Sequence, residues 1–337
     1  MSSMLNFFIG RGVVLGLIIR TLLGVGQIHF FGGWVCLELN ILLFIAVINL
    51  GEGRGAGARI KYFIIQGVGS SALLWTLGLR AIGGSGLARE GLIALALSLK
   101  LGVAPFQGWF IRVLSMLSWE LILLASTLQK ILPVFLLRRL EHEVLGWLIG
   151  LRAGVRVLGS INQVYLKKIL GYSSVFITAW LLACEGEFSA RIEYLGVYRV
   201  ALVALVLAQV SSFVLELNET LRGLGLAMGA VFIGRLLRIG GAPPLIGFYA
   251  KVSVVTVIVR SGHLIWRVGL VLSSVFLLYL YMRIFYFIFG LLARQGLSTR
   301  PHQAFGRALG LLRVLVVLPW VLCLGVMHGK FWTFRPK

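Results

Sequence analysis

The chain has 337 residues, of which 59% are hydrophobic and 13% are charged, and its mean hydropathy is +0.97. A water-soluble protein of this length needs more charged surface, so the composition excludes the soluble globular class. The formal net charge of +21, mostly arginine, would suit a nucleic-acid-binding protein, but the basic residues are scattered through apolar runs. We therefore predict no nucleic-acid partner, and we interpret the basic span ends as contacts with anionic phospholipids such as cardiolipin.

Apolar stretches of about 20 residues recur along the chain, and each is long enough to cross a hydrocarbon core of roughly 30 Å. They are continuous, whereas the strands of a membrane barrel alternate in segments of about ten residues. Since a helix satisfies every backbone group within one span, we predict an all-α polytopic transmembrane bundle of about 11 helices, two of them discontinuous. Short polar linkers leave no room for a soluble domain, so residues 1–337 are predicted to form a single transmembrane domain. The predicted spans are 4–23, 26–50, 61–82, 90–112, 119–138, 143–161, 166–184, 194–215, 222–259 (broken), 263–292 and 308–328.

The N-terminus and the cysteines carry no sign of processing or of redox chemistry. The first span lacks a clear small-residue cleavage site, so we interpret it as a span and not as a removed signal peptide. The cysteines Cys36, Cys184 and Cys323 lie far apart, and no pair has metal or redox spacing, so they are interpreted as small core residues. We predict no metal site, no cofactor and no iron–sulfur, haem or zinc chemistry within this chain.

Two spans are interrupted in mid-run. In LSLKLGVAPFQGWF, Pro105 follows a glycine and an alanine, and in RIGGAPPLIGFYAKV a glycine pair precedes Pro243 and Pro244. Proline removes a backbone donor and clashes with the preceding turn, while glycine permits a departure from the helix. Broken helices in two corresponding parts of a chain are typical of a transporter-type site. An ordinary proline kink is the alternative at each position.

Four ionisable residues lie inside these apolar spans. Glu38 has mostly apolar residues on both sides, Lys100 precedes the first interruption, Lys130 lies in LILLASTLQKILPVFLL, and Lys251 follows the second interruption. A charge near the middle of a span costs at least a few kcal/mol, so such residues normally face a bundle interior and indicate a functional site. A carboxylate beside a lysine holds it charged and discharges it on moving away, which makes a switchable proton site. Snorkelling of a lysine to the headgroups is the alternative.

Seven segments carry a resemblance to a known family. In order and spacing they resemble mitochondrial NADH–ubiquinone oxidoreductase chain 2, a family of antiporter-like membrane subunits of respiratory complex I. The matches run from about residue 34 to residue 286. The segments are GWVCLELN, KYFIIQGVGSSALLW, LSLKLGVAPFQGWF, STLQKILP, GSINQVYLKKILGYSSVF, GGAPPLIGFYAKV and YLYMRIFY.

The resemblance implies roles for the same four residues. Glu38 would pair with Lys100 of the first broken helix, Lys130 would be the connecting lysine, and Lys251 would be the lysine of the second broken helix. Together they would form a polar axis at half the membrane depth, along which protons are handed on. The resemblance also implies that NADH, FMN, iron–sulfur clusters and ubiquinone are bound by partner subunits of complex I, in the mitochondrial inner membrane.

The sequence departs from the family pattern in two ways. Ile177 and Gln107 stand where the family often has histidine, which leaves water or Lys168 for proton entry near Ile177 and a hydrogen-bonding but uncharged amide at Gln107. Arginine is also unusually frequent within or near spans. It is interpreted as snorkelling or pairing between helices. The alternative is that some positions are serine or glycine, because certain animal mitochondria read AGA and AGG codons that way. These positions are Arg20, Arg80, Arg156, Arg199, Arg235 and Arg267.

Three functions follow from these patterns. The motifs favour a proton-translocating subunit of NADH:ubiquinone oxidoreductase, with no redox chemistry of its own because the chain lacks a dinucleotide fingerprint, haem ligands and cysteine clusters. An independent cation/proton antiporter of the related bacterial family would use the same broken helices and lysines. A passive membrane anchor would show no loss of coupling when Lys100 or Lys251 is replaced.

Overall fold

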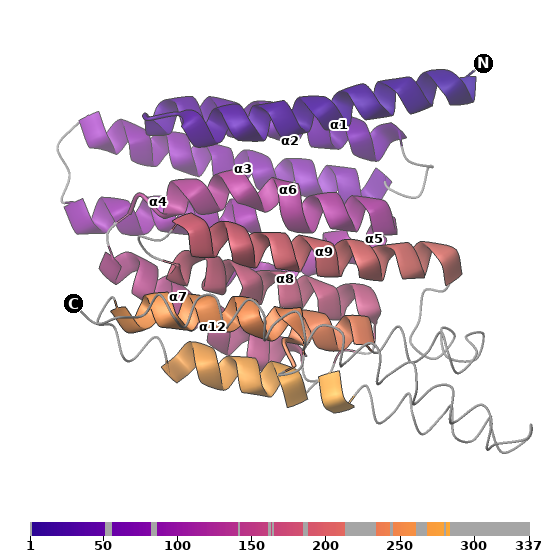
Figure 1. The fold of residues 1–337 in the computed structure, drawn as a ribbon. Coiled ribbons are helices and arrows are strands. Elements are labelled where there is room, and N and C mark those ends of the chain that lie inside the picture. The colour runs from indigo at the N-terminus through magenta and orange to yellow at the C-terminus, as the bar shows by residue number, and fades with distance from the viewer. Residues whose placement is uncertain are drawn as a thin grey trace, which may run out of the picture. The chain divides into compact units, whose positions relative to one another are not determined.

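The computed structural model describes residues 2–50, 56–81, 86–140, 142–160, 163, 165–184, 188–212, 234–242, 245–260, 268–279 and 281–283. Within these ranges every regular element is a helix, which confirms the predicted helical bundle (Figure 1). The predicted span 308–328, Cys323, Pro243 and Pro244 lie outside the described residues. The helices are α1 (Ser2–Gly26), α2 (Phe30–Leu50), α3 (Ala56–Ala81), α4 (Gly86–Leu101), α5 (Gln107–Met116), α6 (Trp119–Leu137), α7 (His142–Ser160), α8 (Leu166–Ala183), α9 (Phe188–Ser212) and α12 (Ile246–Arg260).

The chain divides into two compact units. The first consists of Met1–Gln163 with Lys167–Ala183, and the second consists of Val164–Leu166 with Cys184–Lys337. The single transmembrane domain stays a prediction.

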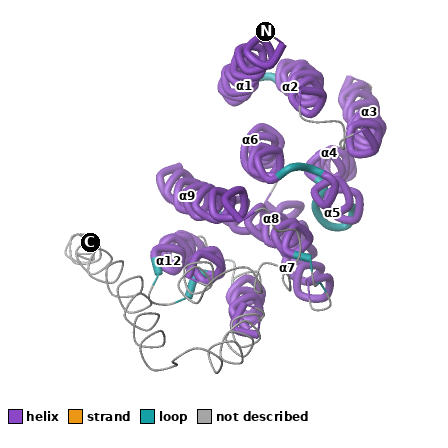
Figure 2. Tube along the Cα trace, turned by 90° about the vertical axis from the view of Figure 1, so that its right-hand side faces the viewer, coloured by secondary structure: helices purple, strands orange, loops and turns teal. Residues whose placement is uncertain are grey.

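The first unit has its core where α2, α3, α4 and α6 meet. Helix α2 packs against α1 and α3, and α4 packs against α3, α6 and α7. Helix α6 also contacts α1 and α2, and Figure 2 shows it end-on with α1 and α2 on one side and α4 and α5 on another. Three of the four predicted ionisable residues belong to this core, because α2 carries Glu38, α4 carries Lys100 and α6 carries Lys130.

The outer surface of the helices suits a bilayer. Four described helices are long and apolar enough to cross a membrane, namely Phe30–Leu50, Ala56–Leu79, Trp119–Leu137 and Leu166–Ala183. Large apolar side chains remain exposed on the outer helices, for example Leu22 on α1 at 68% and Trp75 on α3 at 73%. Such exposure would be costly in water but is the expected surface in lipid. The chain is a multi-pass membrane protein.

Both predicted interruptions are true breaks and not kinks. The first predicted span of this kind, 90–112, is two helices, because α4 ends at Leu101 and α5 begins at Gln107. In the second unit a helical segment over 234–240 ends before α12 begins at Ile246, and α12 packs against α9. The glycines Gly102 and Gly241 have φ angles of 60° and 71°, which end the preceding helix in the left-handed region.

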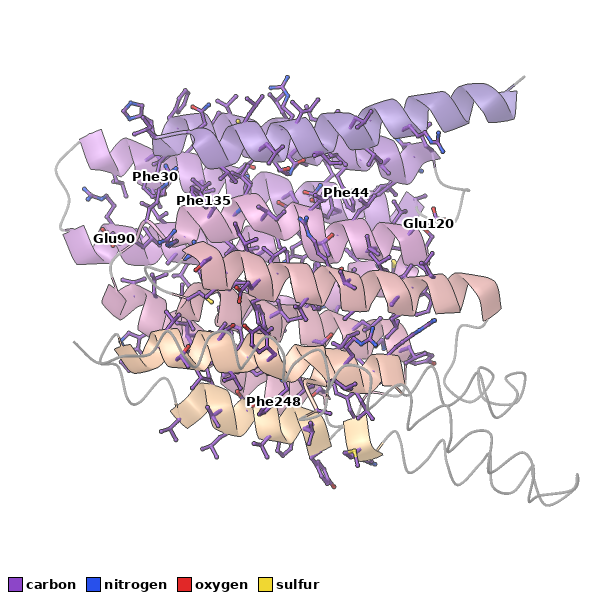
Figure 3. All side chains as sticks on the ribbon, viewed as in Figure 1. Phe30, Phe44, Glu90, Glu120, Phe135 and Phe248 are labelled. Atoms are coloured by element: carbon purple, nitrogen blue, oxygen red, sulfur yellow. The ribbon has the colours of Figure 1, made fainter. Side chains whose placement is uncertain are left out.

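Contacts of Arg139 at one end of the first unit hold α2 beside α6. Arg139, just after α6, donates hydrogen bonds to the backbone carbonyls of Gln27 and Ile28 in the α1–α2 connection. Its guanidinium also lies 5.8 Å from the ring centroid of Phe30 and 5.5 Å from that of Phe135, two side chains labelled at this end of the unit in Figure 3. The helix of Glu38 is thereby fixed beside the helix of Lys130.

Candidate functional site

The first break places Lys100 in the last turn of α4. The N–H of Gly102 donates to the carbonyl of Leu99 at 3.1 Å, and the N–H of Val103 donates to the carbonyl of Ser98 at 3.2 Å. This pair of bonds is the Schellman arrangement, in which the N–H groups after a helix pair with carbonyls of its last turn. The break therefore holds its shape through local hydrogen bonds, and Lys100 has a fixed backbone position.

Glu38 and Lys100 form an ion pair across two helices. The Nζ atom of Lys100 lies 3.0 Å from Oε1 of Glu38. The lysine side chain is 1% exposed and the glutamate side chain is 32% exposed, so the outer partner of the pair is the carboxylate. Gly69 on α3 makes room for the lysine, because a Cβ atom there would lie 2.7 Å from Cγ of Lys100. The structure thus brings together the two residues that the resemblance pairs.

Lys130 is buried in α6 in a different environment. Its Nζ atom donates to the hydroxyl of Ser174 on α8 at 2.9 Å and lies 4.4 Å from the ring centroid of Phe110 on α5. A ring face and a hydroxyl oxygen both attract an ammonium group, but neither supplies a full negative charge. Among the described residues no carboxylate pairs with Lys130. The two buried amines therefore differ in their partners, a carboxylate for Lys100 and a hydroxyl and a ring face for Lys130.

A small cavity lies between the two lysines. It measures about 20 Å³ as the space open to the centre of a water molecule, and both Lys100 and Lys130 line it. Its other polar walls are Tyr62 and Gln66 of α3 and Gln129 of α6. The amide oxygen of Gln129 accepts a hydrogen bond of 3.4 Å from the hydroxyl of Tyr62, while its amide nitrogen is buried without a partner. A space of this size with polar walls accommodates an ordered water molecule.

An aromatic row closes the cavity toward α2 and α5. Phe44, labelled in Figure 3, stacks at a tilt on Tyr62 with ring centroids 5.0 Å apart, and Tyr62 in turn lies 6.0 Å from Trp109. Trp109 meets Phe110 edge-on at 5.7 Å. Three of these rings, Tyr62, Trp109 and Phe110, line the cavity directly.

Lys251 belongs to the second unit and lies at the second break. Its Nζ atom donates to the carbonyl oxygen of Gly240 at 2.5 Å, so the amine sits on the end of the preceding helical segment. The side chain is buried, with 8% exposed. A Cβ atom on Gly241 would lie 2.8 Å from this Nζ atom, so here too a glycine makes room for the lysine.

The sequence analysis missed a buried cation beside the first break. Arg152 on α7 is 0% exposed, and it donates to the hydroxyl of Ser98 at 3.1 Å. Two of its guanidinium nitrogens, Nε and Nη1, are buried without a partner, and its charge acts on Lys130. The site therefore holds a buried guanidinium beside Ser98 in addition to Lys100 and Lys130. A basic residue in mid-span was visible in the sequence, but nothing local indicates which face of α7 it takes.

The sequence analysis also did not identify the row of buried polar residues on α3, although the spacing of these residues could have indicated it. Tyr62, Gln66 and Ser70 follow one another at four-residue spacing, and all three are buried. Polar residues at this spacing lie on one face of a helix, so a buried polar stripe on an apolar span could have been predicted. The same spacing argument could not have identified Ser174, because its role depends on its contact with Lys130 of α6.

The structure shows the burial of most residues at which the sequence departs from the family pattern. Ile177 is buried in α8, and Lys168 lies partly exposed near the start of that helix. Gln107 begins α5, and its amide oxygen is buried without a partner. Of the arginines named above, Arg20, Arg199 and Arg235 are partly exposed, while the side chains of the other three lie outside the described residues.

Comparison with known proteins agrees with this geometry. Residues 80–277 match the family model described as NADH:quinone oxidoreductase/Mrp antiporter, TM. NADH-ubiquinone oxidoreductase chain 2 of Artemia franciscana is 30% identical over 263 residues, which cover 78% of this chain and 84% of that protein.

Two solved structures share the fold. A chain of respiratory complex I from Thermus thermophilus with bound aureothin superposes with a TM-score of 0.69 at 22% identity, covering 93% of this chain and 77% of that chain. A chain of the Mrp complex from a Dietzia species gives 0.66 at 19% identity, covering 81% of this chain and 59% of that chain. The match over both breaks and the shared fold lead to one conclusion: this chain belongs to the NADH:quinone oxidoreductase/Mrp antiporter transmembrane family, among the relatives of NADH–ubiquinone oxidoreductase chain 2.

Proposed function

We propose that the chain is a proton-translocating membrane subunit of respiratory complex I in the mitochondrial inner membrane. In this role it contributes to the coupling of NADH oxidation and ubiquinone reduction, whose redox chemistry takes place in partner subunits that hold NADH, FMN, iron–sulfur clusters and ubiquinone. Glu38, Lys100, Lys130 and Lys251 carry the protons. The observation that supports this proposal most is the ion pair of Glu38 with the buried Lys100, whose side chain lines a cavity together with Lys130.

The pair of Glu38 and Lys100 works as a switch because the partner of Lys100 is a charged carboxylate, while Ser174 and Phe110 beside Lys130 are uncharged. A carboxylate at 3.0 Å stabilises the charged form of Lys100. When that carboxylate moves away, the buried ammonium loses its counter-charge and releases its proton. The cavity offers a water molecule and the amine of Lys130 as the nearest acceptors. There the proton binds the amine of Lys130, whose partners Ser174 and Phe110 attract the ammonium group without supplying a full negative charge.

Arg152 gives the transfer a direction. Its guanidinium is a fixed positive charge near Lys130 and repels the ammonium group that forms when Lys130 takes up a proton. The proton therefore resides on Lys130 only briefly and moves on. Lys251, at the second break, is the later station in this scheme.

The test is Lys100→Met in the assembled complex. Methionine keeps the length and apolar stem of lysine and removes the amine, so we expect normal assembly with loss of this chain's share of proton pumping. The measurement is protons moved per NADH oxidised in sealed vesicles. Unchanged pumping at an unchanged rate of NADH oxidation contradicts the proposal.

An independent cation/proton antiporter is the second candidate, and the structural likeness to a chain of an Mrp complex favours it over an anchor. Reconstitution separates the two. If the purified chain alone exchanges Na⁺ for protons in liposomes, the antiporter is correct. A chain that purifies only within a large assembly supports the complex I subunit.

A further inference from the structure

The two breaks have the same backbone design. At each, the glycine N–H donates to the carbonyl three residues before it, and the next N–H donates to a carbonyl five residues before it. In the second break these bonds run from Gly241 to Arg238 at 3.2 Å and from Ala242 to Leu237 at 3.1 Å. A third bond closes each turn, from Phe106 in the first and from Leu245 in the second. The lysines therefore differ in their place relative to the turn, since Lys100 lies before the glycine and Lys251 after it, and in the side chains around them, while the turn itself is the same.

The breaks differ in what binds the carbonyls at the end of the first half-helix. In the first break the amide nitrogen of Gln66 donates to the carbonyl of Lys100 at 2.8 Å, and the indole N–H of Trp109 donates to the carbonyl of Leu99 at 3.1 Å. In the second break the carbonyl of Gly240 accepts from the lysine of the site itself, Lys251. Counted from the glycine of each turn, Gly240 corresponds to Leu101. Neutral donors therefore bind the carbonyls of Leu99 and Lys100 in the first break, while an ammonium group from the following helix binds the last carbonyl before the glycine in the second.

This difference matters because a lysine in the last turn of a helix readily bonds the terminal carbonyls. Those carbonyls carry the negative end of the helix dipole and attract a cation. Lys100 sits in that turn, yet its amine reaches Glu38 at 3.0 Å. The carbonyls it would otherwise bind already have donors from α3 and α5.

We infer that Gln66 and Trp109 are positioning residues that keep the Lys100 amine off its own helix end, so that it exchanges only between Glu38 and the cavity. This inference rests on the proposed function for its consequence but not for its geometry. Both residues line the cavity, so the blocked carbonyls form part of its wall. With neither donor present, the carbonyls of Leu99 and Lys100 are open to the Lys100 amine, and its contact with Glu38 weakens.

The experiment combines Gln66→Met with Trp109→Phe in the assembled complex. Gln66→Met removes the donor at nearly constant size, while Trp109→Phe removes the indole N–H and also leaves a smaller ring. Each lost hydrogen bond shifts the balance between the two amine positions about fivefold toward the backbone. We expect the density of the Lys100 amine in a cryo-electron microscopy map to move from Glu38 to the carbonyl of Leu99 or Lys100. We also expect protons pumped per NADH to fall while NADH oxidation continues.

Trp75→Phe is the matched control, because Trp75 on α3 is 73% exposed and points away from the site. It should leave both the map and the pumping ratio unchanged. Should the double variant fail to assemble, Trp109→Phe alone carries the test with a smaller shift.

Failure of this inference is distinguishable from failure of the proposed function. A double variant in which Lys100 stays on Glu38 and pumping is normal overturns the inference, whatever Lys100→Met does. If Lys100→Met pumps normally while the double variant moves the amine, the positioning role holds and the proposed function is wrong.

Discussion

The two broken segments share one kind of backbone turn but hold their lysines in different environments. In the first, Lys100 lies before the glycine and pairs with the carboxylate of Glu38 on another helix. In the second, Lys251 lies after the glycine and binds the helix end of Gly240. The Schellman turn supplies the interruption in both. The two lysines lie on opposite sides of it, and Lys100 contacts a carboxylate on another helix while Lys251 contacts the end of the preceding helical segment. Five substitutions test the first break and its comparison with the second.

Glu38→Gln has the largest expected effect. The amide keeps the shape but not the charge, so Lys100 is left buried without a counter-charge, at a cost of about 3 kcal/mol in the free energy of unfolding. We expect proton pumping per NADH to be lost and the thermal inactivation midpoint of the complex to fall. Glu120→Gln is the control, because Glu120 lies exposed in the first turn of α6, as labelled in Figure 3. Equal effects of the two changes contradict a specific role for Glu38.

Gly102→Ala and Gly241→Ala compare the two turns directly. Both positions have positive φ, so alanine is strained at each by about 1 kcal/mol. At Gly102 the new Cβ would also lie 2.3 Å from Cβ of Phe110, which is close to its backbone, so we expect a total near 3 kcal/mol. At Gly241 it meets the flexible end of Lys251, which can move. Thermal stability of the complex should fall more for the first variant, and the reverse order would refute the comparison.

Arg152→Met tests the buried cation beside the first break. Removing a charge with two unpartnered nitrogens should raise the free energy of unfolding by about 2 kcal/mol. Arg112→Met, on the exposed face of α5, should change stability by less than about 0.5 kcal/mol. A clear loss of stability with Arg152→Met would show that the guanidinium has a partner. Peptide mass spectrometry of the mature chain identifies the residue at position 152 directly and tests the codon interpretation of the arginines as well.

Gly69→Ala has the smallest expected effect. Its Cβ would press on the lysine stem, 2.7 Å from Cγ of Lys100, and displace the amine from Glu38 at a cost of about 1 kcal/mol. Gly67→Ala on the same helix meets no atom within 4 Å and should be neutral or slightly stabilising. Pumping ratios of the two variants check this. If both behave alike, the glycine has no role in placing the lysine.

The sequence predicted the helical bundle and both interruptions because these depend on local features. Apolar runs, glycine and proline act within a few residues, whatever the rest of the chain does. The boundaries were less accurate. Helix α3 begins at Ala56, ahead of the predicted residue 61, because GARIK continues the helix beyond the apolar part of the span. Helix α9 likewise begins at Phe188 and not at 194.

The site was predicted only as far as single residues can show it. A glutamate and three lysines are anomalous in apolar spans, and the family resemblance supplied the pairing of Glu38 with Lys100. The caps from Gln66 and Trp109 could not be predicted, because each joins a side chain to the backbone of another helix, and the approach of α3 and α5 to the end of α4 depends on the tertiary fold. The burial of Arg152 depends on the rotation of α7, which spacing alone does not determine.

The self-contained hydrogen bonding of each break has a consequence for how the protein is made. All three bonds of the first turn join residues between Ser98 and Phe106, and those of the second join residues between Leu237 and Leu245. Neither turn requires a partner helix to satisfy these amides. We therefore expect each interrupted span to enter the bilayer with its turn already formed, before Glu38 reaches Lys100. Insertion and charge pairing are then separate events, and a variant that disrupts the ion pair should still be delivered to the membrane.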